Sequence, residues 1–171
     1  GYHLFTEMFG EFDQSYLNKN VFLQGISSAQ YDSTVGIVGE TERKALFKDM
    51  RRRGEKMKGI FLHHNILPVP HSREKGLLED SGDILRRAVD EKIDLIMTGT
   101  SSHPYTAKIE DTLVINANSL SSVYQRSLFG NSYNMIDIYE NVIVVSEVNS
   151  LWGTRRIVGM WKRNKHSSNS D

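Results

Sequence analysis

One stretch decides the fold that the sequence predicts, residues 59–68, which run Gly59-Ile60-Phe61-Leu62-His63-His64-Asn65-Ile66-Leu67-Pro68. Its first part, residues 59–64, is apolar enough for a buried strand, and the two adjacent histidines stand where the chain leaves that strand. Enzymes with α/β folds place metal ligands and catalytic groups at such strand ends. The stretch therefore predicts a buried strand and a candidate site at its end.

The neighbouring segments extend this strand into an α/β fold. A second apolar run, residues 94–99, is separated from it by a loop and by a helical pattern that continues to Lys92. A loop and a helix of this length join parallel strands. Upstream, a strand over 21–27 and a helix over 40–53 repeat the alternation, so we expect a sheet that is at least partly parallel.

After Gly99 the pattern changes to short strands without helices. Segments 105–109, 113–117, 133–139, 142–148 and 156–161 are strand-like, and Glu140-Asn141 is a polar break typical of a hairpin. These segments predict an antiparallel meander. The fold class expected is therefore α/β, with a mixed sheet and an antiparallel layer.

Composition limits the classes of partner. The chain has 171 residues, of which 39% are hydrophobic, enough for one globular domain with a core. Lys plus Arg and Asp plus Glu each total 21, so no global field draws the protein to nucleic acid or to a membrane, and such partners would need local patches. Cysteine is absent, which excludes disulfides and thiolate zinc sites. We expect a cytoplasmic protein with no membrane or nucleic-acid partner.

Several short motifs follow one another along the chain: a Gly-x-Ser-Ser turn at 25–28, His63-His64, Pro68-Val69-Pro70, the strand end at Gly99, and Val114-Ile115-Asn116-Ala117-Asn118-Ser119. Their order resembles the C-terminal half of calcineurin-like metallophosphoesterases, close to the branch of cyclic-nucleotide and related phosphodiesterases. The likeness runs from about Asn20 to Val145. It implies a metallophosphatase-type β-sandwich flanked by helices, with a dinuclear metal centre that hydrolyses phosphoric esters.

The resemblance also assigns candidate site residues. His63 stands at the family's lone histidine ligand, with His64 beside it, and residues 99–104 stand at the family's Gly-His-x-His. Thr100 and Ser102 replace the two histidines of that motif, and His103 lies one residue later. The metal candidates are thus His63, His64 and His103, for Mn, Fe or Zn, and the phosphate-binding candidates are the hydroxyls of Thr100 and Ser102.

Each candidate has a structural alternative. One ring of the histidine pair can pack in the core, hydrogen-bonded, while the other faces a loop. Likewise, the hydroxyl-rich turn at 98–102 can bond only to its own backbone.

The family's remaining motifs, Asp-x-His, Gly-Asp-x-x-Asp and Gly-Asn-His-Asp/Glu, are absent from this sequence. Two hypotheses account for this: the N-terminal half of the fold is missing and Gly1 marks the cut, or the metal site has degenerated. The expected division is an N-terminal helical or connecting segment over 1–19, the C-terminal portion of a metallophosphoesterase-like domain over 20–164 and a disordered polar tail over 165–171.

The expected function is that of a metal-dependent phosphoric-ester hydrolase, incomplete and inactive as this chain alone. Its partners are then a small phosphate ester and either the missing N-terminal half or another copy of the chain. The alternative is a non-catalytic scaffold or protein-interaction module on a degenerate metallophosphoesterase fold.

Overall fold

The alternation of strands and helices that the sequence predicts is present in the computed structural model. The structure describes residues 6–8, 10, 14–30, 33–54, 56–70, 76–100, 103–123 and 127–163. One mixed sheet has the spatial order β1-β2-β3-β4-β6-β5. Its strands are β1 (Ser15–Leu17), β2 (Val21–Gly25), β3 (Met57–Phe61), β4 (Leu95–Thr98), β5 (Tyr105–Ile109) and β6 (Thr112–Asn116).

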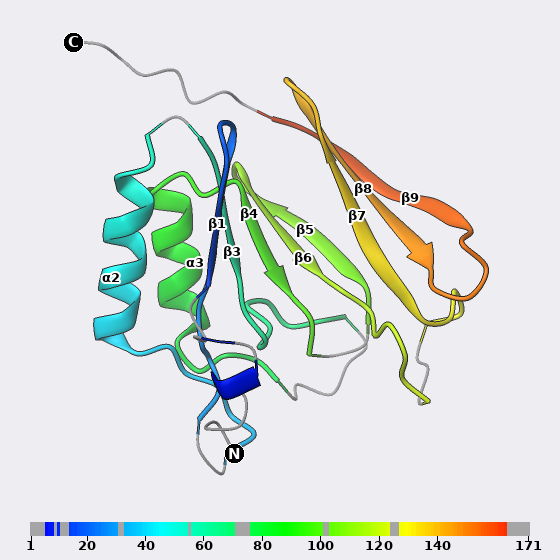
Figure 1. Cartoon of the computed structure of the whole chain (residues 1–171), viewed down its shortest axis with the longest axis horizontal. Coiled ribbons are helices and arrows are strands. Elements are labelled where there is room, and N and C mark those ends of the chain that lie inside the picture. The colour runs from blue at the N-terminus through cyan, green and yellow to red at the C-terminus, as the bar shows by residue number, and fades with distance from the viewer. Residues whose placement is uncertain are drawn as a thin grey trace.

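Strands β2, β3 and β4 are parallel neighbours, and each pair is joined through a helix. The helices are α2 (Glu40–Arg51) and α3 (Ser81–Asp90), and Figure 1 shows both on the same face of the mixed sheet. The predicted βαβ arrangement is therefore present. The helix predicted over 40–53 ends at Arg51, close to Gly54, whose φ of 59° lies in the left-handed region.

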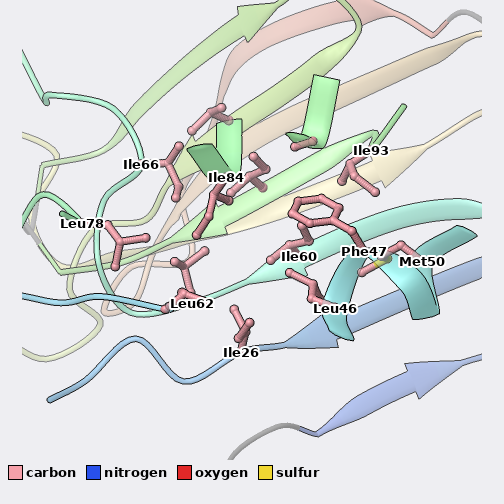
Figure 2. Close-up of a cluster of buried hydrophobic side chains, with 14 of the residues drawn as sticks. Ile26, Leu46, Phe47, Met50, Ile60, Leu62, Ile66, Leu78, Ile84 and Ile93 are labelled. Atoms are coloured by element: carbon pink, nitrogen blue, oxygen red, sulfur yellow. The ribbon is translucent and has the colours of Figure 1, made fainter. Parts of the chain in front are cut away.

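The core between helices and sheet is made of aliphatic and aromatic side chains. Figure 2 shows Phe47 of α2 and Ile84 of α3 gathered around Ile60 of β3. Each of these side chains is completely buried. At the edge of this core, the Asp80 carboxylate accepts hydrogen bonds from the backbone N–H groups of Val38 and Gly39, at 3.1 and 3.0 Å, and so ties the start of α3 to the start of α2.

A second, antiparallel sheet covers part of the opposite face of the mixed sheet (Figure 1). It has the order β7-β8-β9, with β7 (Ser132–Ile138), β8 (Val142–Asn149) and β9 (Arg155–Lys162). Ile143 and Val145 of β8 pack against Leu95 and Leu113 of the mixed sheet. Successive residues of a strand face opposite sides, so the mixed sheet takes part in both cores.

Two sequence expectations need correction. The strand predicted over 59–64 is β3, Met57–Phe61, so both histidines lie in the loop that follows it. The meander predicted after Gly99 is also wrong in part, because β6 pairs in parallel with β4 and belongs to the mixed sheet. All five residues of β6 are buried, as expected of a strand with a helix layer on one side and a second sheet on the other.

The structure describes the two ends of the chain only in part. The expected connecting segment, 1–19, contains a helical turn at 6–8 and strand β1, and the tail expected to be disordered, 165–171, lies outside the described residues. Within the part of the chain that the structure describes, no helix is long and apolar enough to cross a membrane.

Candidate functional site

The loops that follow β2, β3 and β4 meet at one end of the mixed sheet and enclose a cleft of about 510 Å³. It is lined by Gly25–Ala29, Phe61–His63 and Met97–Gly99. Because the three strands are parallel, their carboxyl ends lie at the same edge, which is where open α/β sheets bind ligands. The cleft is therefore the candidate site, and it includes His63.

His63 is exposed at this cleft and is held in place from the next loop. Its Nε2 atom lies 3.0 Å from Oγ1 of Thr100, which follows β4. Gly76 packs closely against Thr100, since a Cβ atom built on this glycine would lie 2.5 Å from Thr100 Cγ2, and its φ of 91° suits glycine. The structure thus brings together two of the predicted site residues, His63 and Thr100.

His64 has a different environment, although its ring centroid lies only 4.8 Å from that of His63. The side chain is buried, and its Nδ1 atom lies 2.8 Å from the hydroxyl oxygen of Ser28. Burial lowers the pKa of His64 below 6.5, and the adjacent His63 lowers it further, while a backbone hydrogen bond with Thr34 acts in the opposite direction. The ring is therefore neutral at pH 7 and engaged in packing and hydrogen bonding.

The remaining candidates are less closely associated with the cleft. The main-chain carbonyl of His103 accepts a hydrogen bond from Nδ2 of Asn116, at 2.5 Å. Asn116 Oδ1 in turn accepts a hydrogen bond from the buried hydroxyl of Thr98, at 2.9 Å. Ser102 lies outside the described residues.

The candidate residues do not fit a metal ion without further ligands. No group of three or more His, Asp or Glu side chains is placed to hold a metal ion among the residues described. His63 bonds to a hydroxyl and His64 faces the protein interior, so the pair does not present two imidazoles to one point. The predicted set of His63, His64 and His103 is thus not assembled into one centre.

Ser28 and Asn65 also contribute to the site, and the sequence did not single them out. Ser28 holds His64, and the Asn65 backbone N–H donates to the Gly76 carbonyl at 2.7 Å, which closes the loop after β3. Both are buried polar residues a few positions beyond the end of a strand. This position is the sequence signal that could have identified them, because a polar group buried near a strand end must find a hydrogen-bond partner.

The comparisons with known proteins identify the fold. No protein-family model matches the sequence, and no curated protein matches it. The structure is similar to that of GAP50, the anchor in the inner membrane complex of Plasmodium, with a TM-score of 0.61 and 14% identity, covering 91% of this chain and 54% of that one. It is also similar to a dimetal phosphatase from Danio rerio, with a TM-score of 0.56 and 12% identity, covering 76% of this chain and 39% of that one.

These similarities show that the chain has the metallophosphatase-type fold, the fold class expected from its sequence. The chain spans between 39% and 54% of the length of these two structures.

Proposed function

We propose that this domain is a non-catalytic scaffold, a protein-interaction module built on a metallophosphoesterase-type fold. The observation that carries the proposal is the 3.0 Å contact between His63 Nε2 and Thr100 Oγ1. In the family that the sequence resembles, the position of Thr100 holds a metal-binding histidine. Here a hydroxyl stands in its place and bonds to a ring nitrogen of the neighbouring candidate ligand.

The environment of His64 supports the same proposal. Ser28 and the backbone of Thr34 contact this imidazole within the protein, as they would any structural histidine. GAP50, which is named as an anchor, has a similar fold, and one fold can carry different functions. The lack of cysteine fits action in the cytoplasm, where thiols stay reduced and disulfides are rare.

The second candidate function is hydrolysis of a small phosphate ester, such as a cyclic nucleotide, with Mn, Fe or Zn. The exposed imidazole of His63 at the mouth of the cleft favours it, because a neutral imidazole is a suitable ligand for these metals. The other ligands would then come from a separate N-terminal half of the fold or from another copy of the chain. In that case Thr100 would orient His63, and the hydroxyls near the cleft would contact the phosphate.

Metal analysis and phosphodiesterase assays separate the two functions. We expect protein purified without chelator to contain no stoichiometric metal, and neither wild type nor His63→Ala to hydrolyse an aryl phosphodiester in added Mn²⁺. Stoichiometric metal, with turnover that His63→Ala abolishes, would establish the hydrolase instead.

A gain-of-binding variant tests the geometry directly. Thr100→His gives this position the residue type of the family, and we expect it to bind Zn²⁺ more tightly than wild type in calorimetry, since two imidazoles then face one another. Thr100→Val, which removes the hydroxyl without adding a ligand, is the matched control. If Thr100→His binds Zn²⁺ no better than Thr100→Val, the two positions do not face one metal, and the observation that carries the proposal fails.

A further inference from the structure

Two loops at one end of the antiparallel sheet present exposed apolar side chains. One is the segment between β6 and β7, of which residues 117–123 and 127–131 are described, and the other is the turn between β8 and β9, residues 150–154. Figure 1 draws these described residues at the same end of the sheet. The side chains are Leu120 (58% exposed), Val123 (92%), Leu128 (109%), Leu151 (76%) and Trp152 (75%). We call these five residues the apolar tip.

Hydrogen bonds join the two loops into one unit. Ser150 donates through its backbone N–H to the Asn131 carbonyl at 2.9 Å and through its hydroxyl to the Leu120 carbonyl at 3.0 Å. Asn149, at the end of β8, donates to the Phe129 carbonyl at 2.6 Å. The apolar side chains therefore project from two loops whose backbones are joined by hydrogen bonds.

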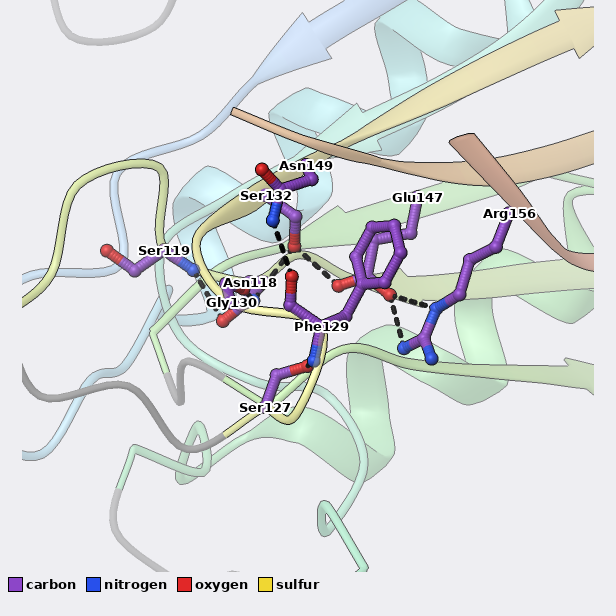
Figure 3. Close-up of polar contacts among 9 residues, drawn as sticks. All are labelled: Asn118, Ser119, Ser127, Phe129, Gly130, Ser132, Glu147, Asn149 and Arg156. Atoms are coloured by element: carbon purple, nitrogen blue, oxygen red, sulfur yellow. Dashed lines mark hydrogen bonds and ion pairs between the residues drawn. The ribbon is translucent and has the colours of Figure 1, made fainter. Parts of the chain in front are cut away.

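A polar network centred on the buried residues Ser132 and Glu147 connects these loops to the antiparallel sheet (Figure 3). Asn118 donates to the Ser132 hydroxyl at 2.8 Å, and Ser132 donates in turn to the Glu147 carboxylate. Arg156 binds the same carboxylate through Nε at 2.8 Å and lies over the Phe129 ring, 4.4 Å from its centroid. The network fixes the loop that precedes β7 to strands β8 and β9.

An ion pair at this end of the molecule presents its cationic partner to solvent. The Glu147 side chain is completely buried, whereas the side chain of its partner Arg156 is 51% exposed. Neither residues 117–131 nor residues 148–156 contain Asp or Glu. The exposed partner of this ion pair is thus the guanidinium, and neither loop supplies a carboxylate of its own.

We propose that the apolar tip inserts into the interface of an anionic lipid bilayer. The aliphatic side chains would enter the acyl boundary, Trp152 would lie among the headgroups, and Arg156 would contact lipid phosphate. Side chains as exposed as Val123 and Leu128 project rather than line a groove, and a bilayer accepts such projections without a complementary pocket. The neutral total charge still excludes long-range attraction, so the contact is local.

Vesicle flotation of the full chain tests this inference, which goes beyond the proposed function and does not depend on it. We expect wild type to float with vesicles of phosphatidylcholine and phosphatidylserine, more weakly with phosphatidylcholine alone, and less as salt is raised. The double variant Leu128→Ser, Leu151→Ser should lower partitioning about tenfold or more. The matched control is Met160→Ser, since this side chain is 66% exposed on β9 outside the tip.

The fluorescence of Trp152 gives a second measurement. Its emission should shift to shorter wavelength when phosphatidylserine vesicles are added, and Trp152→Phe should remove the shift. Wild type that does not float with either vesicle, or an equal loss in Met160→Ser, overturns the inference. It is also overturned if the double variant abolishes self-association in sedimentation experiments without lipid while lipid binding stays unchanged, because the tip is then a protein contact.

Discussion

At the scale of single residues, the two adjacent histidines have different environments. His63 is exposed at the cleft, whereas His64 is buried and bonded to Ser28. Gly36 allows this burial, because a Cβ atom at that position would lie 2.2 Å from His64 Nδ1. The buried imidazole is therefore a structural group with a consequence for stability.

Acid should destabilise the protein through His64. Its pKa in the folded state lies below the value of 6.5 that we assume for the unfolded chain, so the unfolded chain takes up a proton first as pH falls. The contribution to stability is thus complete above pH 6.5 and is lost between that value and the lower folded-state pKa. For one group the slope is at most about 1.4 kcal/mol per pH unit.

Urea unfolding of wild type and His64→Asn between about pH 7.5 and about pH 5 measures this effect. The variant lacks the titrating ring, so its unfolding free energy should depend less on pH than that of wild type. Equal slopes for the two proteins would show that His64 does not carry the pH dependence.

At the scale of elements, two connections are joined around the candidate site, the loop between β2 and α2 and the loop between β3 and α3. Gly36 pairs with Leu78, and Asn65 pairs with Leu77, through isolated bridges between segments distant in sequence. The Glu79 backbone N–H donates to the Gly36 carbonyl at 2.9 Å. The loop after β2 and the two ends of the loop between β3 and α3 therefore form one backbone framework behind the cleft.

Gly36→Ala should disturb this framework. The added methyl meets the His64 ring, which Ser28 holds in place, so we expect a loss of about 1 to 3 kcal/mol in unfolding free energy. Gly82→Ala is the matched control, since a Cβ atom there meets nothing within 4 Å, and in helix α3 it should gain up to about 1 kcal/mol. Urea unfolding compares the two variants, and a neutral Gly36→Ala would contradict the close packing of His64.

The helices and strands could be predicted from the sequence more readily than the pairing between strands. Apolar periodicity located α2, α3 and most strands, because burial on one side leaves a regular pattern. It did not show that β6 lies beside β4, since strand pairing depends on contacts between distant segments. For the same reason it did not reveal the bonds of His63 and His64, whose partners lie 37 and 36 residues away along the chain.

At the scale of the whole molecule, the mixed sheet is shared by two cores. Helices α2 and α3 pack on one face, and the antiparallel sheet packs on the other through Ile143 and Val145. Leu95 and Ile96 are consecutive residues of β4, yet they belong to different cores. Loss of either core exposes the same strands, so we expect the two layers to unfold together.

Val145→Ala tests this coupling from the antiparallel sheet. The side chain is completely buried, and its truncation should lower the unfolding free energy by about 2 kcal/mol. In a Trp152→Phe background, fluorescence reports on Trp161, which packs against the same core as Val145, while far-UV circular dichroism is dominated by the helices. Both signals should shift to lower urea concentration by the same amount, because the layers share the mixed sheet. If the fluorescence transition moves alone, the antiparallel sheet is a separate folding unit and the shared sheet does not couple the cores.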